Sequence, residues 1–275
     1  PTYSLGVSWR MAEEEFVKTH LPWINQLNMR ATYGVQGNVV TSVSPDLITQ
    51  YQGILPGYNE YYLTISSLPN PLLKWERTKT WNVGLDLQLF NGITMSLEYY
   101  GRRSNAIINQ DIAQEYGMNT MKLNGGRIHN HGLEFSMNIT PYQRKDFAWT
   151  IGFNASKNWN KTQNDDIQTK ANKITKSDFI SGSSDRFLKK GYPLSAFWSY
   201  SFAGLDPETG YPTFNLIDFE EADPDIDPTT FLVYSGQKDP YFTGGVDTRI
   251  RYKSLSLGVN FSVLLGAKKR LPNPY

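Results

Sequence analysis

The sequence of 275 residues contains no cysteine, so neither a disulfide framework nor a thiolate metal site can form. It has no apolar run of about 18 residues or more, which excludes a transmembrane helix. It also lacks an excess of charge of one sign, because 27 Lys and Arg residues nearly balance 26 Asp and Glu residues, for a net charge of +1. The weak net field argues against a nucleic-acid partner.

Motifs of catalysis are missing as well. The sequence has no Gly-x-Ser-x-Gly element, no phosphate-binding loop and no His-Glu-x-x-His segment. We therefore predict neither a cofactor nor an enzymatic activity. Because acidic pairs are numerous, a β-rich glycan-cleaving enzyme is kept as the weakest of three alternatives.

The sequence is rich instead in alternation of apolar and polar residues. Four segments between Trp81 and Ala155 alternate in this way, and their apolar positions carry no charge. Successive side chains of a strand point to opposite faces, so each segment has one apolar and one wet face. Many such strands of about ten residues are typical of a membrane-spanning β-barrel. The mean hydropathy of −0.47 and the 14% aromatic content suit a barrel with a polar lumen and aromatic girdles.

The pattern predicts about ten strands in all. They cover residues 3–10, 27–35, 81–89, 93–100, 133–139, 147–155, 197–204, 211–217, 243–253 and 255–265. The strand at 211–217 is weak, because Pro212 removes a hydrogen-bond donor.

Short and long connections alternate between these strands. The short ones are 91–92, 141–146, 206–210 and 253–254, and the long ones are 36–80, 103–126, 158–196 and 218–242. This alternation favours an antiparallel up-and-down barrel with short periplasmic turns and long outer loops. Residues 11–26 are then periplasmic and can form a short helical turn. The runner-up is a soluble or surface β-sandwich module that binds glycans, as an adhesin does.

Several motifs, in order, resemble one known family over nearly the whole chain. The segment Asn70-Pro71-Leu72-Leu73-Lys74-Trp75-Glu76 with Val83-Gly84-Leu85-Asp86, the segment 124–134 (NGGRIHNHGLE), and the turn Gly204-Leu205-Asp206-Pro207-Glu208-Thr209-Gly210 are similar to segments of SusC/RagA-type TonB-dependent transporters. Residues 4–10 and 30–38 are similar to the preceding barrel strands of that family.

The resemblance implies a 22-stranded outer-membrane barrel of Bacteroidetes-type bacteria that imports oligosaccharides or peptides. It implies an N-terminal plug moved by the TonB complex, a SusD-like lipoprotein lid, and a dimer of SusC–SusD pairs. Residues 1–275 are then part of one barrel domain, and we expect the plug, the TonB-contacting segment and the first and last strands to lie outside this sequence.

Charged residues on the predicted lumen face are candidates for contacts with the plug or the solute. They are Arg10, Arg30, Asp86, Glu98, Glu134, Asp247, Arg249 and Arg251. The simpler interpretation is that they only form ion pairs between strands. Arg or Lys on the opposite face would cost roughly 2–4 kcal/mol at the membrane midplane, so confinement to one face is expected of any barrel.

Aromatic residues of the first long loop are the candidate solute contacts. Tyr51, Tyr58, Tyr61 and Tyr62 cluster there with Asn59 and Glu60. Flat rings and amides suit sugars and peptide backbones alike. The alternative is that these side chains pack the loops together or contact the lid.

No metal site is predicted. His129 and His131 share a strand face, but His20 lies in another segment and no carboxylate stands at a ligand spacing. Asp223, Asp225 and Asp227 alternate as in a calcium loop, yet prolines interrupt them and the closing Gly and Glu are missing. We interpret them as a solvated acidic loop.

Overall fold

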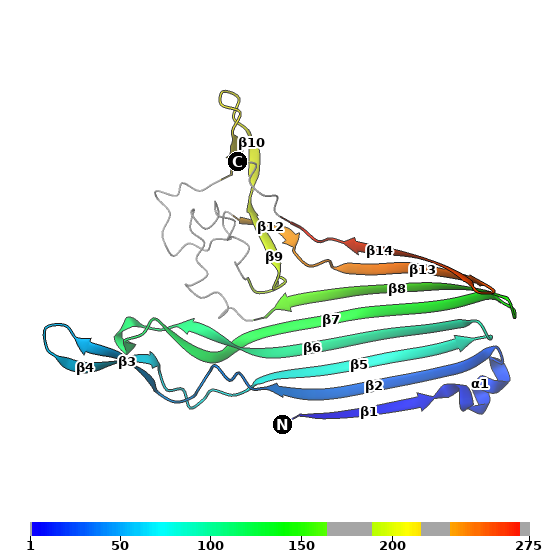
Figure 1. The fold of residues 1–275 in the computed structure, drawn as a ribbon, viewed down its shortest axis with the longest axis horizontal. Helices are drawn as coiled ribbons and strands as arrows, with labels where there is room; N and C mark the ends of the chain where they lie inside the picture. The colour runs from blue at the N-terminus through cyan, green and yellow to red at the C-terminus, as the bar shows by residue number, and fades with distance from the viewer. Residues whose placement is uncertain (1, 164–188, 216–231, 270–275) are drawn as a thin grey trace.

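A computed structural model describes residues 2–163, 189–215 and 232–269, and it contains one large antiparallel sheet (Figure 1). Its strand order is β1-β2-β5-β6-β7-β8-β13-β14. These strands are β1 (Tyr3–Arg10), β2 (Ile24–Asn38), β5 (Glu76–Leu89), β6 (Ile93–Asp111), β7 (Thr120–Gln143), β8 (Phe147–Thr162), β13 (Phe242–Tyr252) and β14 (Leu255–Leu265). Each strand pairs with the wall strand before it in the chain, so the predicted all-β, up-and-down architecture is confirmed.

The connections separate by length between the two ends of the sheet (Figure 1). At the short-turn end lie residues 90–92, 144–146 and 253–254, together with a 3-10 turn, η1 (Met11–Glu13), and α1 (Glu15–His20). At the long-loop end lie the chain segments between β2 and β5, β6 and β7, and β8 and β13. Short and long connections alternate along the wall strands as predicted, except that 206–210 is not one of the wall's short turns, and the helical turn after β1 is confirmed.

One tight turn differs in detail from the prediction. The connection from β5 to β6 has three residues, since Leu89 pairs directly with Ile93. Its left-handed residue is Phe90, with a φ of 48°, and neither Asn91 nor Gly92 has a positive φ. The carbonyl of Trp23 accepts a hydrogen bond from the Phe90 amide, which ties this turn to the start of β2.

Two wall strands are much longer than the alternation indicated. β6 has 19 residues and β7 has 24, or about 60 and 80 Å at the usual rise. The predicted loop at 103–126 is therefore mostly strand, and only residues 112–119, with a 3-10 turn η2 (Gln114–Tyr116), connect the two. A hairpin of β3 (Ile48–Leu55) and β4 (Glu60–Ser67) also projects at the long-loop end (Figure 1).

Two of the ten expected strands pair outside the wall. β9 (Ala196–Tyr200) pairs with β12 (Leu232–Gln237), and β10 (Phe202–Leu205) pairs with β11 (Pro212–Phe214). Strands of three to six residues are too short to cross a bilayer. The predicted turn at 206–210 is a hairpin turn, but it belongs to the long-loop end. Because an even number of predicted strands, two, is absent from the wall, the predicted directions of β13 and β14 still hold.

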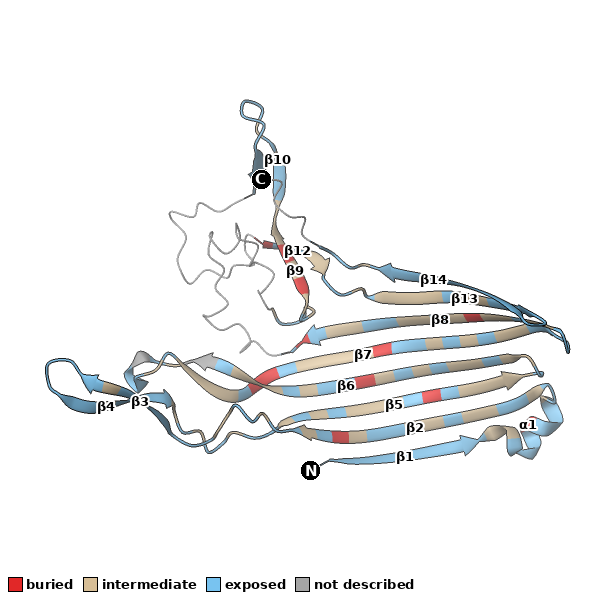
Figure 2. Ribbon diagram, in the orientation of Figure 1, coloured by how far each residue is buried: buried red, intermediate tan, exposed pale blue. Residues whose placement is uncertain are grey.

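Few large apolar side chains of the wall are buried, and those of the edge strands β1 and β14 are exposed (Figure 2). Leu5 is 73% exposed, Leu257 64% and Phe261 66%. A small cluster of Ala196, Trp198 and Leu232 is buried instead, in the β9–β12 pair. Within the described residues, no second large sheet covers the apolar face of the wall. A β-sandwich would bury that face against a second sheet, so the structure does not support the runner-up.

Helices contribute little to the fold. In the described part of the chain, none is long and apolar enough to cross a membrane.

Candidate functional site

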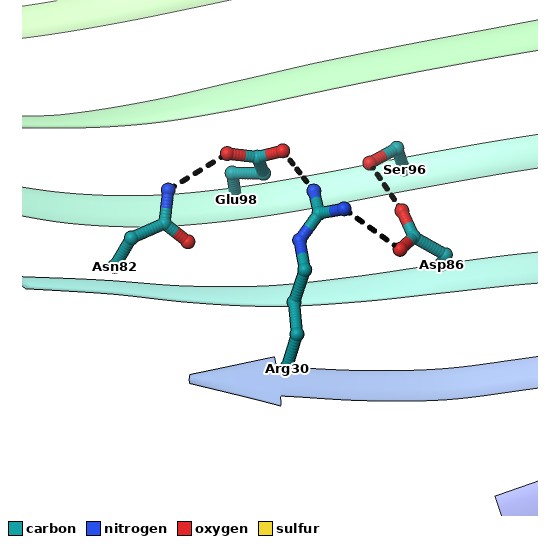
Figure 3. A network of polar contacts seen from close by, with 5 residues as sticks. All are labelled: Arg30, Asn82, Asp86, Ser96 and Glu98. Carbon is teal, nitrogen blue, oxygen red and sulfur yellow. Dashed lines mark hydrogen bonds and ion pairs between the residues drawn. The ribbon is translucent and has the colours of Figure 1, made fainter. Parts of the chain in front are cut away.

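An ion-pair network occupies the polar face of the wall across β2, β5 and β6 (Figure 3). Arg30 Nη1 lies 2.9 Å from Asp86 Oδ2, and Arg30 Nη2 donates to Glu98 Oε1. Asn82 Nδ2 donates to Glu98 at 2.8 Å, and Ser96 Oγ donates to Asp86 at 2.8 Å. The Arg30 side chain is 36% exposed and both carboxylates are 28% exposed. One guanidinium thus holds two carboxylates from neighbouring strands.

Gly84 makes this network possible. It is buried and lies directly between Arg30 and Glu98 in the register. A Cβ at Gly84 would stand 2.5 Å from Arg30 Nε. The Arg30 side chain therefore crosses β5 through the space that glycine leaves, and this is how it reaches β6.

The other predicted lumen residues share the polar face but do not join this network. Glu134 lies opposite Glu98 in the register, and Asp247 lies over Gly152. Arg249 and Arg251 are exposed and lie nearer the short-turn end. Arg10 pairs locally with Glu13, at 3.6 Å between exposed side chains. The interpretation as inter-strand ion pairs thus fits Arg30, Asp86 and Glu98, but none of the others in the described sheet.

A shallow polar depression lies beside the network. It has a volume of about 220 Å³ and is lined on β6, β7 and β8 by Ser96, Glu98, Glu134, Ser136, Asn154 and Ser156 among others. Hydroxyl, amide and carboxylate groups of this kind bind water or polar ligands by hydrogen bonds.

Two aromatic rows bound the apolar face. At the long-loop end, one register row contains Tyr33, Trp81, Gly101, His131 and Trp159. At the short-turn end stand Trp9, Phe90, Tyr142, Trp149 and Tyr252, all exposed.

The spacing of these rows matches a bilayer. Trp149 and Trp159 lie on the same strand, β8, and are ten residues apart, which is about 33 Å along the strand. At the usual barrel tilt of 35–45° this corresponds to a band of about 25 Å, the height of the apolar belt of outer-membrane barrels.

The β3–β4 hairpin brings together some of the predicted solute contacts. The rings of Tyr51 and Tyr61 are 5.7 Å apart, and both side chains are exposed, by 59% and 73%. Tyr58, 75% exposed, and Asn59, with a φ of 52°, lie in the hairpin turn. Tyr62 follows Tyr61 in β4 and so points to the opposite face of the hairpin.

The same hairpin has an apolar face that the sequence analysis did not identify. Register and alternation place Ile54, Leu63 and Ile65 on the side of Tyr51 and Tyr61. Ile54 is 50%, Leu63 62% and Ile65 44% exposed. A bulge between Tyr51 and Gly53 shifts the alternation of β3, which hid this pattern in the sequence.

Residues of the recognised motifs hold the long connections in place. Asn124 Oδ1 accepts a hydrogen bond from the Lys74 amide at 2.7 Å, and Asn124 Nδ2 donates to the Lys74 carbonyl at 2.6 Å. Glu76 accepts from the Ile107 amide and from Asn38 Nδ2. These side chains fasten the segment before β5 to the β6–β7 hairpin, so their part in the motif is structural.

The turn at 206–210 is organised by one carboxylate. Asp206 Oδ1 accepts hydrogen bonds from the amides of Thr209, at 2.8 Å, and Glu208, at 2.9 Å. These backbone hydrogen bonds, with a side-chain one from Thr209, lower the pKa of the Asp206 carboxyl from its ordinary value. Gly210 closes the turn with a φ of 71°.

The histidines take part in aromatic stacking. The rings of His129 and His131 are 5.4 Å apart on one face, as predicted, and His131 stacks on Trp159 at 5.2 Å. His20 lies in α1, at the short-turn end. Within the described ranges, no three His, Asp or Glu side chains form a group that could hold a metal ion. Asp223, Asp225 and Asp227 lie outside the described residues.

Comparisons with known proteins agree with this geometry. A family model described as TonB dependent receptor-like, beta-barrel, matches residues 1–261. The TonB-dependent receptor P3 of Formosa agariphila is 26% identical and covers 96% of this chain and 28% of the relative. The TonB-dependent receptor SusC of Bacteroides thetaiotaomicron is 27% identical over 95% of this chain and 27% of its own length.

A solved structure shows the same fold. The RagAB peptide importer in its "open-open" state superposes with a TM-score of 0.77 at 22% identity, over 97% of this chain and 28% of that chain. The chain thus spans about 28% of the length of the proteins that it matches. The predicted resemblance to SusC/RagA-type proteins is confirmed, and this chain belongs to the TonB-dependent receptor β-barrel family, whose barrels cross the bacterial outer membrane many times.

Proposed function

We propose that residues 1–275 form part of one barrel domain that imports nutrient oligomers across the outer membrane. The observation that carries the proposal is the two-faced wall. Its apolar face has a belt about 25 Å high that is uncharged except for Lys157 beside the outer aromatic row, and its opposite face carries ion pairs and a polar depression. Such a wall separates lipid from a wet path and performs no bond chemistry, and this family consists of receptors and transporters.

Gating is proposed to come from an N-terminal plug that the TonB complex moves. The support is that several charges on the polar face have no ion pair in the described sheet, among them Glu134, Asp247, Arg249 and Arg251. These groups are placed to make reversible contacts with a plug or with solute. The pair of Arg30 with Asp86 and Glu98 is already satisfied within the wall, so we assign it to the frame.

The β3–β4 hairpin is proposed to contact solute under a SusD-like lipoprotein lid. Its support is the exposed apolar face with Tyr51 and Tyr61, since an apolar patch of this kind is typical of an interaction site. Both glycans and peptides fit flat rings and amide groups. The RagAB structure is of a peptide importer, which makes peptides the first class to test. A dimer of barrel–lid pairs is part of the same proposal.

Uptake by intact cells tests this function. The gene is deleted and restored, and entry of fluorescent oligopeptides and oligosaccharides is measured with and without an uncoupler of the proton-motive force. We expect energy-dependent entry of one class, lost on deletion. Tyr61→Ala should reduce entry, whereas Tyr211→Ala, which is equally exposed at 73% but lies after the 206–210 turn, should not. Unchanged entry of both classes after deletion would refute the proposal.

A further inference from the structure

Six cationic side chains stand on the same face as the lipid-facing apolar residues. They are Arg77, Lys79, Arg103, Arg127, Lys157 and Lys161, which we call the outer cation group. All six are exposed, and all lie toward the long-loop end of β5, β6, β7 and β8. The register places four basic side chains opposite one another on consecutive strands, in the order Lys79, Arg103, His129 and Lys161.

The positive charges of the outer cation group are not balanced by nearby negative charges of the described wall. Like charges that face each other across neighbouring strands destabilise a sheet. None of the six forms an ion pair with a carboxylate of the described residues. The wall carboxylates whose side chains the structure describes, namely Glu76, Asp86, Glu98, Glu134 and Asp247, all lie on the other face. An external anion bound to this group would offset the repulsion.

The depth of the group identifies where that anion lies. Lys161 is two residues beyond Trp159 in β8, about 5 Å farther along the membrane normal at the usual tilt. Lys157, on the membrane side of Trp159, places its Nζ 5.0 Å from the ring centroid of Trp159 and 6.0 Å from that of Tyr241. The Lys157 side chain thus turns its ammonium toward the interface, as lysines at a bilayer surface do. Lys157 and Lys161 thus place the β8 end of the group at the level of lipid headgroups.

The width of the row suits a headgroup with more than one phosphate. Neighbouring strands are about 4.8 Å apart, so the row from Lys79 to Lys161 spans about 14 Å. Arg103, near its centre, has a guanidinium that binds phosphate oxygens in pairs. We infer that the outer cation group binds the phosphates of an outer-leaflet lipid headgroup and so holds a lipid at a fixed place on the outside of the barrel. This inference needs only the membrane placement and is independent of the imported solute.

The test uses the receptor as expressed natively, purified in detergent. Native mass spectrometry measures binding of diphosphorylated lipid A, of the same lipid with its phosphates removed, and of diphosphorylated lipid A in competition with inorganic phosphate. The variant is Lys79→Gln with Arg103→Gln and Lys161→Gln. The control removes three exposed lysines at the short-turn end, by Lys18→Gln, Lys145→Gln and Lys253→Gln. Thermal unfolding of both variants checks that they are folded.

We expect the triple variant to bind diphosphorylated lipid A about 100-fold more weakly, because each basic residue near an anionic surface contributes about 1 kcal/mol. The control variant should bind as the wild type does, and removing the phosphates should abolish the difference. Equal binding by wild type and triple variant would overturn the inference. So would full competition by millimolar inorganic phosphate, which would indicate a site for the free ion.

Discussion

The two faces of one sheet treat charge in opposite ways. On the polar face, Arg30 is shared by Asp86 and Glu98, so opposite charges are neutralised within the wall. On the apolar face there is no charge between the aromatic rows except Lys157, next to the outer row, and beyond that row the wall's described charged side chains are all cations. The difference shows that the surrounding medium selects the residues. Paired charges of opposite sign occur on the face toward the lumen. Charged side chains are nearly absent from the lipid-facing belt, and positive charges gather at the level of the headgroups.

The largest expected effect comes from placing a charge in the lipid belt. Leu97 lies on the apolar face of β6 in the same register row as Ala155 of β8. Ala155 lies six residues after Trp149 and four before Trp159, so this row is near the middle of the belt. Leu97→Arg should lower the free energy of unfolding in lipid vesicles by about 2–4 kcal/mol. Ser136→Arg, at nearly the same depth on the polar face, is the matched control and should change it by less than about 0.5 kcal/mol. Equal losses would remove the distinction between the faces.

A smaller effect is expected from breaking the network on the polar face. Arg30→Met leaves two carboxylates without their shared cation and should cost about 1–2 kcal/mol, the lower value being favoured because the Arg30 side chain is 36% exposed. Adding Asp86→Asn and Glu98→Gln should recover part of this loss. Denaturant titration of the single, double and triple variants measures the coupling, and strictly additive changes would show that the three groups act independently.

Gly84 offers a sharper test of the same network. Gly84→Ala puts a Cβ 2.5 Å from Arg30 Nε, so the arginine must move, at a cost of about 0.5–1 kcal/mol. Gly258→Ala is the control, because the only atom near a Cβ there is the Thr248 carbonyl oxygen, at 4.0 Å. If the Gly84 substitution is as costly with Met at position 30 as with Arg, its effect does not come through the network.

The smallest effect concerns Asp206, a charged residue that lies outside the wall sheet, in the turn between β10 and β11. The pKa of Asp206 is lowered by backbone hydrogen bonds, so its contribution to turn stability is present above the unfolded pKa and is lost as pH falls through the folded pKa. Hydrogen exchange of residues 206–210 should therefore become faster relative to the intrinsic rate only at acidic pH. Asp206→Asn should remove that pH dependence. An Asp206 carboxyl that titrates at its ordinary value would contradict the assignment.

Much of the wall could be predicted from the sequence because lipid imposes a period of two. The segment from Leu133 to Ile139 has an apolar residue at every second position. This pattern was enough to predict that the segment is a strand, which side chains face the lipid, and in which direction the strand runs. Outside the lipid belt this constraint ends. Residues 103–126 are polar and irregular in pattern, yet they extend β6 and β7, since backbone pairing alone continues the hairpin.

The short strands could not be distinguished from wall strands, because an alternating pattern does not show whether the apolar side chains meet lipid or other protein side chains. The segment from Phe197 to Gly204 alternates well, but its Trp198 is buried in a small cluster with Ala196 and Leu232 and never meets lipid. The Arg30 network was predicted only as one of two interpretations, because alternation assigns a face and not a partner. The outer cation group could have been found in the sequence. Extending each alternating pattern past its uncharged stretch places Lys79, Arg103 and Lys161 on the same face as the apolar residues.

Probe accessibility along β7 tests the central claim most directly, namely that the uncharged face is solvated by lipid. The chain has no cysteine, so single cysteines at positions 133–139 can carry spin labels one at a time. In vesicles, positions 133, 135, 137 and 139 should be accessible to dissolved oxygen and protected from a water-soluble nickel complex, and positions 134, 136 and 138 should show the reverse. Equal accessibility of both sets to the nickel complex would contradict the account.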